Sequence, residues 1–183
     1  MNLSVEEENR ILRLRVESLE RELRFLKTHT AIAQGMRGES LTIDLAGGVS
    51  GSYASQHDIT LKDGTRVEVK FSKLNTPNLK SSTKRWNWSK PFGWKDKGKD
   101  YDFLLLIGEK DERFKEHDID DSPYVFFLVP YNKVHEITTS GAAIGSNVQL
   151  VSSFINLRSE QSLAIRKYQV SDVVLQQISM KKK

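Results

Sequence analysis

Two acidic residues and a lysine lie at a spacing that can support chemistry. Asp58 stands shortly before the tripeptide Glu68-Val69-Lys70. Carboxylate oxygens are the ligands that hard divalent cations prefer, and an ammonium beside them can orient or deprotonate a water. If these side chains converge, the sequence predicts a divalent-cation site with an adjacent lysine. The alternative is an ordinary ion-pair network on a solvated hairpin.

The three side chains meet only if the surrounding segments form a β-hairpin in one particular register. Lys62-Asp63-Gly64 separates two strand-like segments, His57 to Leu61 and Thr65 to Phe71. A two-residue turn would place the two acids on opposite faces. A three-residue loop with Gly64 in the left-handed conformation places them on the same face, and we therefore expect that loop.

This register fixes the pairs across the hairpin and the content of its two faces. The expected pairs are Ile59 with Val67, Thr60 with Arg66, Asp58 with Glu68, and Gln56 with Lys70. The face expected to cover the core carries Ile59, Leu61, Val67, Val69 and Phe71. The opposite face carries Gln56, Asp58, Glu68 and Lys70.

Other segments of the chain have the pattern of a scaffold around this hairpin. The body is expected to begin near Thr30 with a helix that Gly47-Gly48 ends. The apolar runs Tyr101 to Gly108 and Tyr124 to Pro130 are too continuous for one-sided strands, so they predict central strands covered on both faces. The remaining expectations are a solvated acidic loop at Glu109 to Asp121 with Asp111 on the surface, edge strands at Val134 to Ile137 and Val148 to Ile155, and a helix from Ser171.

Taken in order, these residues resemble a known family. Arg37-Gly38-Glu39 on a helix, Asp58 at a strand start and Glu68-Val69-Lys70 on the next strand are similar to the PD-(D/E)xK, or restriction-endonuclease-like, nuclease superfamily. The resemblance covers about Thr30 to Ile137. His57 precedes Asp58, so the literal Pro-Asp pair is missing.

The resemblance implies a fold, a reaction and a set of site residues. The implied fold class is α/β (α+β), a restriction-endonuclease-like core with a central mixed β-sheet flanked by helices. The implied reaction is metal-dependent hydrolysis of DNA phosphodiester bonds with Mg²⁺, for which Mn²⁺ can substitute. The implied catalytic residues are Asp58, Glu68, Lys70 and Glu39, the metal ligands are Asp58, Glu68, Glu39 and the Val69 carbonyl, and Gln56 is a possible accessory residue.

Positive charge is concentrated after the hairpin. From Lys62 to Lys99 there are eleven Lys and Arg against three Asp and Glu, a net charge of +8, which leaves −4 for the rest of a chain of net charge +4. Such a segment with interleaved aromatics suits a phosphate backbone. The candidate DNA contacts are Lys73, Lys80, Lys84, Arg85, Trp86 and Trp88, although for the two tryptophans core packing is favoured over base or sugar stacking.

The first 28 residues carry a heptad pattern. The d positions are Val5, Leu12, Leu19 and Leu26, and the a positions are Asn9, Val16 and Leu23. The facing g and e′ pairs of a parallel coil are Glu8 with Arg13, Arg15 with Glu20, and Glu22 with Lys27, all of opposite sign. We therefore expect residues 5–26 to form a parallel homodimer or a higher homo-oligomer. The alternatives are a helix docked on its own domain and a coil with a different partner.

Composition narrows the remaining possibilities. The absence of cysteine excludes disulfides and thiolate metal sites, and the four histidines are scattered. No stretch is long and apolar enough to span a membrane, and the acidic N-terminus lacks a secretory pattern, so a cytoplasmic or nucleoid-associated protein that is not secreted is expected.

The resulting expectation is a coiled-coil helix at 1–28 followed by a nuclease domain at 30–183. A type II restriction-like endonuclease fits best. A Holliday-junction resolvase or other branched-DNA nuclease is the first alternative, because it also needs paired sites. A non-catalytic DNA-binding or assembly protein of the same fold is the second alternative.

Overall fold

A computed structural model of the chain describes residues 5–28, 30–52, 55–76, 83–93, 98–114, 119–141, 145–154, 157 and 159–178. The chain divides into two compact units, Met1–Met36 and Arg37–Lys183. The helix α2 (Thr30–Ala46) runs across the boundary between them. Lys80 and the C-terminal residues 181–183 lie outside the described residues.

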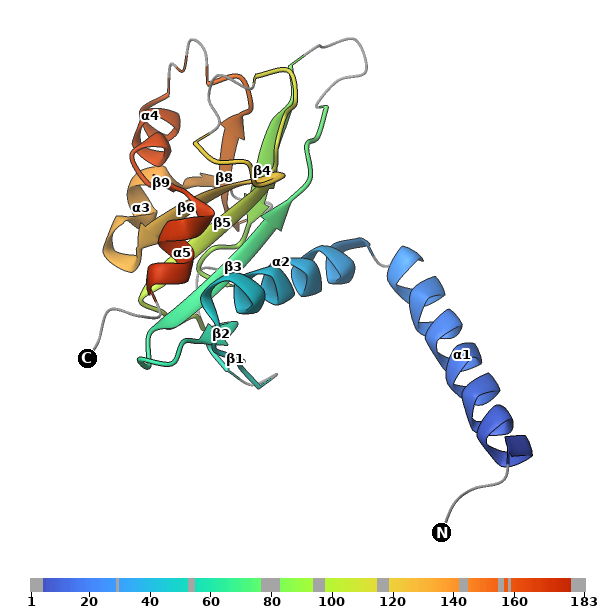
Figure 1. The fold of residues 1–183 in the computed structure, drawn as a ribbon. Helices are drawn as coiled ribbons and strands as arrows, with labels where there is room; N and C mark the ends of the chain where they lie inside the picture. Colours follow the sequence, from blue (N-terminus) through green and yellow to red (C-terminus); the bar gives the residue numbers. More distant parts are fainter. Residues whose placement is uncertain are drawn as a thin grey trace. The chain divides into compact units, whose positions relative to one another are not determined.

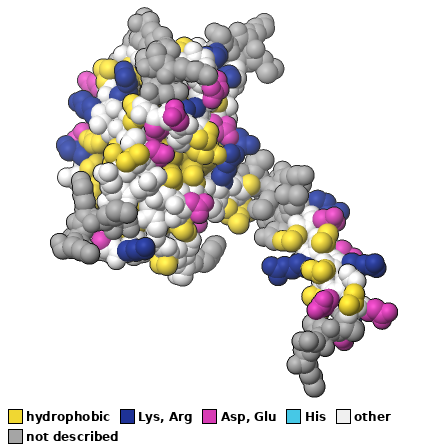
Figure 2. Space-filling model, viewed as in Figure 1, with side chains coloured by type: hydrophobic (Ala, Val, Ile, Leu, Met, Phe, Trp, Pro, Cys, Tyr) yellow, Lys and Arg dark blue, Asp and Glu magenta, His cyan; other side chains and the backbone are white. Residues whose placement is uncertain are grey.

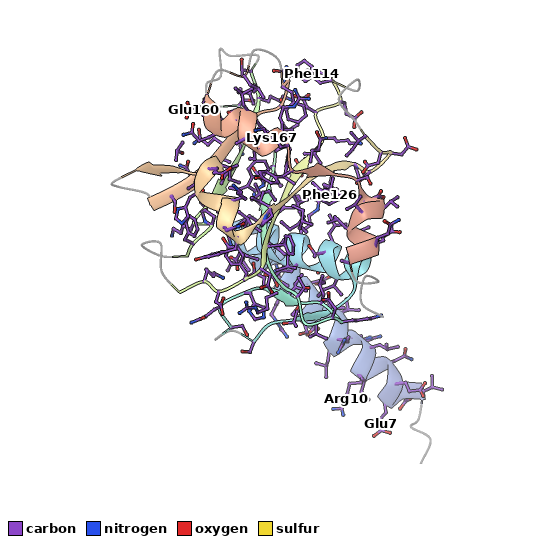
Figure 3. All side chains as sticks on the ribbon, turned by 90° about the vertical axis from the view of Figure 1, so that its left-hand side faces the viewer. Glu7, Arg10, Phe114, Phe126, Glu160 and Lys167 are labelled. Carbon is purple, nitrogen blue, oxygen red and sulfur yellow. The ribbon has the colours of Figure 1, made fainter. Side chains whose placement is uncertain are left out.

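The first unit contains α1 (Val5–Thr28), a helix of 24 residues with acidic side chains in its first turn. Acids at that end complement the helix dipole. Its described apolar side chains are exposed, and on the side of the helix that Figure 2 shows, apolar side chains lie among charged ones. Figure 3 shows Glu7 and Arg10 projecting from the same helix.

The second unit is a mixed α/β structure built on a six-stranded, mostly antiparallel sheet with the order β1-β2-β3-β5-β6-β9. Only the pair β3 with β5 is parallel. Figure 1 shows β3 between β2 and β5, with α2 beside β3. The strands are β1 (Val49–Ser50), β2 (Ile59–Thr60), β3 (Arg66–Ser72), β5 (Phe103–Glu109), β6 (Tyr124–Pro130) and β9 (Gln169–Val170).

Among the described residues of this unit, a three-stranded antiparallel sheet and four short helical segments complete the fold. The small sheet has the order β4-β8-β7, with β4 (Arg85–Ser89), β7 (Thr139–Gly141) and β8 (Gly145–Val151). The helical segments are the 3₁₀ turn Tyr131–Lys133, α3 (Val134–Ile137), α4 (Glu160–Arg166) and α5 (Asp172–Ile178). In Figure 3, Glu160 and Lys167 mark the two ends of α4.

The central strands are covered on both faces, as their continuous apolar sequence predicted. Alternate residues of β5 point to opposite sides. Leu105 and Ile107 join the apolar cluster of α2 and α5, while Leu104 and Leu106 join the cluster of the small sheet, α3 and α4. Glu68 is cross-strand from Leu104, so it lies on the face of the small sheet.

The hairpin loop has the predicted three-residue form. Ile59 pairs with Val67 and Thr60 with Arg66, and Gly64 has a φ of 85°, which an L side chain rarely adopts. All five residues expected on the core face are buried. The register is therefore confirmed for those two pairs and for the division of the faces.

The prediction that the ladder continues through Asp58–Glu68 and Gln56–Lys70 is wrong. The ladder stops at Ile59, and Asp58 meets β3 in another way: its amide donates a 3.1 Å hydrogen bond to the Val67 carbonyl. The carbonyl of Gln56 instead accepts a hydrogen bond from the amide of Asp100, at 2.9 Å.

Val134 to Ile137 is a helical turn, α3, and not the edge strand that was expected. Val134 and Ile137 are both buried, and side chains three apart share one face in a helix but not in a strand. Thr138 donates a 2.6 Å hydrogen bond to the Val134 carbonyl at the end of this turn. The segment expected as the other edge strand overlaps β8, but β8 is the central strand of the small sheet, so its assignment to an edge is wrong. The expected helices before Gly47 and after Ser171 are present.

Candidate active site

The predicted acidic residues lie at an edge of β3 that β2 leaves uncovered. Beyond Val67, no described strand pairs with β3 on the β2 side. The carboxylate of Asp58 replaces a neighbouring strand at one position, because its Oδ2 accepts a 2.8 Å hydrogen bond from the amide of Val69. The N–H and C=O of one strand residue point to the same side, so the Val69 carbonyl faces the same edge.

Lys70 joins the two acids into one cluster. Its Nζ bonds to Oε1 of Glu68 and lies 4.0 Å from Oδ2 of Asp58. The side chain of Asp58 is 19% exposed and that of Lys70 is 22% exposed, whereas Glu68 is fully buried. The three residues that the sequence singled out therefore converge.

A second ammonium, that of Lys99, occupies the other side of the same two acids. Its Nζ lies 2.9 Å from Oε2 of Glu68 and 3.5 Å from Oδ1 of Asp58. Burial alone would lower the pKa of Lys99, but Glu68 and Asp58 raise it more, so that the net shift is upward. The sequence reasoning counted Lys99 only as one of many cations. Its position just before β5, the strand parallel to β3, was the available signal.

Glu68 is the most constrained of these groups. Burial raises its pKa, and the ammonium groups of Lys70 and Lys99 only partly oppose that effect. Oε2 pairs with Lys99 by charge and distance, yet among the described residues it receives no hydrogen bond of acceptable geometry. A buried carboxylate oxygen without a hydrogen-bond donor is costly, which sets this position apart from an ordinary ion pair.

Glu39 approaches the cluster from α2. Its pKa is raised, first by partial burial and then by the negative charge of Asp58. The approach depends on Gly38, because a Cβ there would lie 3.1 Å from Cβ of Phe71 and 3.2 Å from Cγ1 of Val69. The missing side chain lets the helix pack closely on β3 and brings the next residue near the two acids.

The donor set fits a hard divalent cation. Among the described residues, no three His, Asp or Glu side chains form a ready metal-binding group. Two carboxylates nevertheless point at one positive centre, the Lys99 ammonium, which occupies the kind of position that a bound cation would take. Oxygen ligands of this type are those that Mg²⁺ uses.

The segment that carries Lys99 is held by its neighbours. Asp102 accepts hydrogen bonds from both the amide and the guanidinium of Arg66, and Asp100 pairs with the same guanidinium. The side-chain hydrogen bond from Arg66 lowers the pKa of Asp102. Gln56 belongs to this scaffold through its carbonyl, and its own side chain is exposed.

The predicted DNA contacts separate into surface and core residues. Lys73 is exposed directly after β3, and Lys84 and Arg85 are half-buried at the start of β4. Arg85 donates a 3.2 Å hydrogen bond to Gln149. Lys80 lies outside the described residues.

Trp86 and Trp88 are core residues, which corrects their assignment as DNA contacts. Each is 1% exposed, and the two rings stack with centroids 5.9 Å apart. Their indole N–H groups donate 2.8 Å hydrogen bonds to the carbonyls of Glu109 and Ile107 on β5. A side chain buried in this way has no face available for a base or a sugar.

Asp111 is also buried, although the sequence placed it on a solvated loop. It is 6% exposed, and its carboxylate accepts hydrogen bonds of 2.8 and 2.9 Å from the guanidinium of Arg113 and one of 2.6 Å from Ser152. The hydrogen bonds from Arg113 lower the pKa of Asp111 to about 2. This carboxylate joins the acidic loop to the small sheet.

No protein-family model matches the chain, and a search of curated proteins finds no match either. None of the described helices is long and apolar enough to cross a membrane. The functional argument therefore depends on the site itself.

Proposed function

We propose that the protein is a Mg²⁺-dependent DNA endonuclease with a restriction-endonuclease-like core. The observation that carries the proposal is the convergence of Asp58, Glu68 and Lys70 at the open edge of β3. There the buried Oε2 of Glu68 has the Lys99 ammonium at 2.9 Å but no hydrogen bond of acceptable geometry from a described residue. An ordinary surface ion-pair network would be solvated and would satisfy its oxygens.

The proposed roles follow from the positions of the side chains. Asp58 and Glu68 hold the metal ion, with the Val69 carbonyl and Glu39 as further oxygen ligands. Bound Mg²⁺ supplies a water of lowered pKa and stabilises the charge that develops on the scissile phosphate. Lys70 orients the attacking water, because its ammonium already lies against both acids. Mn²⁺ can substitute, since the ligands are the same oxygens.

Plasmid nicking tests this proposal. Supercoiled DNA should be cut by the protein with Mg²⁺ and not with EDTA. Lys70→Ala should reduce the rate about 10³-fold, because a positioned proton-transfer group contributes that order of magnitude. Binding of the same DNA in Ca²⁺ should survive. Lys62→Ala is the matched control, since Lys62 is an exposed cation on the loop of the same hairpin. Cleavage by Lys70→Ala at the wild-type rate would refute the nuclease assignment.

A DNA substrate requires a surface that binds phosphates, and we propose Lys73, Lys80, Lys84 and Arg85 for it. Replacing Lys80, Lys84 and Arg85 together with Ala should flatten the slope of log K against log[salt] by about 2 to 3 units, at roughly 0.9 per phosphate contact. An unchanged slope would assign these cations to a solvated surface without a role in binding. DNA as the substrate would place the protein in the cytoplasm or on the nucleoid.

We further propose that α1 assembles copies of the chain. The seam side chains Val5, Leu12, Val16 and Leu19 are between 52% and 73% exposed in the single chain, more than a monomeric helix of this length should leave in water. Ile11 and Leu14 are also exposed but lie outside the a and d positions. A seam of two helices would not cover them, which favours an assembly larger than a dimer or a broader contact.

Removal of residues 1–28 tests the assembly. Sedimentation should show a lower oligomeric state for the truncated protein, and Leu12→Lys with Leu19→Lys should have the same effect, since an ammonium in the seam has no partner. Ser18→Lys, at the off-seam c position, is the control. If double-strand cutting needs two linked sites, the truncated form should nick more and linearise less. An unchanged assembly would refute the coil.

Two other outcomes remain distinguishable. Preferential cutting of four-way junctions over linear duplex would identify a resolvase instead of a restriction-like enzyme. DNA binding without cleavage in any divalent cation would identify a non-catalytic DNA-binding protein. The convergence of Asp58, Glu68 and Lys70 argues against that last outcome, because a binding protein has no need of a buried acid.

A further inference from the structure

Lys99 has no role in the reaction as proposed above, yet it makes the closest contact to Oε2 of Glu68 that the described residues provide. It contacts one oxygen of each acid, and Lys70 contacts the other oxygen of each. The two lysines thus stand on opposite sides of the carboxylate pair. In this arrangement the four charges of Asp58, Glu68, Lys70 and Lys99 cancel.

The two lysines differ in how firmly they are held. Lys70 lies in the middle of β3, where its backbone pairs with Leu106 of β5. Lys99 lies outside any strand, after Gly98, which is exposed and has a φ of 88°. The side chain of Lys99 is 22% exposed, as is that of Lys70, and its four-carbon stem is flexible, so the ammonium can move into water while the backbone stays in place.

The backbone on the other side of Lys99 is fixed. The amide of Asp100 donates to the Gln56 carbonyl at 2.9 Å, and Arg66 pairs with Asp100 and Asp102. A side-chain rotation at Lys99 therefore needs no rearrangement of β5. Once its ammonium leaves, Asp58, Glu68 and Lys70 carry one net negative charge, and an ionised Glu39 makes this two, the charge that a divalent cation neutralises.

We propose that Lys99 is a tethered cation that occupies the metal position between Asp58 and Glu68 in the metal-free protein, and that a divalent ion binds by displacing it. The inference rests on the proposed function, because it takes these two acids as the metal ligands. Lys99 stabilises the buried acids without metal and lowers the metal affinity by competing for the same oxygens. It is a positioning residue and not a catalytic one.

Calorimetric titration of Ca²⁺ into the full-length, DNA-free protein tests the competition. Lys99→Met keeps the length of the side chain without its charge, and it should bind Ca²⁺ at least about tenfold more tightly than wild type, which corresponds to about 1.4 kcal/mol. Lys99→Arg retains a cation and should stay near the wild-type affinity. Lys62→Gln removes one exposed cation elsewhere and controls for net charge. In EDTA, Lys99→Met should unfold at lower urea concentration, and saturating Ca²⁺ should restore most of that loss.

A second measurement uses the wild-type chain, so it does not depend on the folding of a variant. An amine-acylating reagent should modify Lys99 slowly in EDTA and several times faster in saturating Ca²⁺, relative to Lys62. Mass spectrometry measures the extent of modification at each lysine. Protection of Lys99 that is unchanged when Ca²⁺ is bound would overturn the proposal. An unchanged Ca²⁺ affinity in a folded Lys99→Met variant would also overturn the proposal. If that variant also bound DNA more weakly, Lys99 would be a phosphate contact instead.

The failure of this inference is separable from that of the nuclease assignment. If wild type nicks plasmid with Mg²⁺ while Lys99→Met binds Ca²⁺ no more tightly, only the role of Lys99 is refuted. If neither protein binds Ca²⁺ and neither cuts DNA, the metal-dependent function fails and the displacement of Lys99 fails with it.

Discussion

Two carboxylates of the Arg37–Lys183 unit are buried to a similar extent and are held in opposite ways. Asp111 is 6% exposed, and each of its oxygens receives hydrogen bonds from Arg113 or Ser152. Glu68 is 0% exposed, and one of its oxygens receives no hydrogen bond from a described residue. The pKa of Asp111 is lowered to about 2, whereas burial raises the pKa of Glu68 above its ordinary value.

The difference separates a structural acid from an acid available for chemistry. Asp111 prefers to be charged in the folded protein, because a planar guanidinium and a hydroxyl satisfy both of its oxygens. Glu68 is charged at a cost, because the two ammonium groups of Lys70 and Lys99 give positive charge without complete hydrogen bonding. A carboxylate held as Glu68 is held is stabilised further by a metal ion, whereas one held as Asp111 is held is not.

The largest expected effect is on cleavage. Glu68→Gln should lower the rate of plasmid nicking on the order of 10³-fold, because it removes a charged ligand at the reacting centre. Asp111→Asn makes the same chemical change at the other buried acid and should keep the rate within about threefold of wild type, well below the effect of losing a group at the reacting centre. Equal losses for the two variants would remove the distinction between these acids.

The next effect is on stability. Asp111→Asn should lower the free energy of unfolding by about 3 kcal/mol, since the amide NH₂ would face a donor and at least one charged hydrogen bond would be lost. Urea unfolding monitored by circular dichroism measures this. Glu68→Gln in EDTA should cost less, because it also relieves the burial of a charge. A larger loss for Glu68→Gln would show that its lysines hold it as firmly as Arg113 holds Asp111.

Acid pH should affect the two residues in opposite directions. The folded pKa of Asp111 is about 2 and the ordinary value for an aspartate is 3.8, so its contribution, about 2 kcal/mol, is present above pH 3.8 and is lost as the pH falls towards 2. The folded pKa of Glu68 is raised above 4.5, so the folded state binds the proton more tightly than the unfolded state does. The free energy of unfolding therefore falls as the pH rises from 4.5 through the folded pKa. Urea titrations in EDTA should show that Asp111→Asn removes the first slope and Glu68→Gln the second.

The smallest expected effect concerns a single hydroxyl. Ser152→Ala deletes the 2.6 Å hydrogen bond to Asp111 and leaves Arg113 in place. The loss should be about 1 to 2 kcal/mol in unfolding free energy, with no change in nicking rate. Ser159→Ala removes an exposed hydroxyl that caps α4 and has no hydrogen bond to Asp111, so it is a control for the loss of a capping serine hydroxyl elsewhere. A loss of nicking in Ser152→Ala would connect the Asp111 cluster to the reaction.

Local patterns predicted much of the scaffold. The Gly64 loop, the two buried strands and the end of α2 at Gly47 each follow from residue type and short-range sterics, and all are confirmed. The edge strand at Val134 to Ile137 was wrong, because a single helical turn and a short strand have the same apolar content. Only the spacing of Val134 and Ile137, both buried, separates them.

Long-range electrostatic partners were less accessible from sequence. Asp58, Glu68 and Lys70 converge as expected because they lie on one hairpin, where register determines proximity. Lys99 and the Asp111–Arg113–Ser152 cluster were missed, because their contacts depend on the parallel placement of β5 and on the small sheet. Sequence spacing offered only the position of Lys99 just before β5 and the two-residue separation of Asp111 and Arg113, neither of which identifies the partners across the sheets.

The stacked pair Trp86 and Trp88 gives the protein an internal optical probe. Every tryptophan and tyrosine of the chain lies after residue 52, so α1 has no intrinsic near-ultraviolet chromophore other than phenylalanine. Indole emission comes from the Arg37–Lys183 unit alone, with Trp86 and Trp88 reporting the packing of the small sheet against β5 and Trp94 adding to the signal, while the far-ultraviolet signal also contains the 24-residue helix. The two signals separate the melting of α1 from that of the Arg37–Lys183 unit in a single sample.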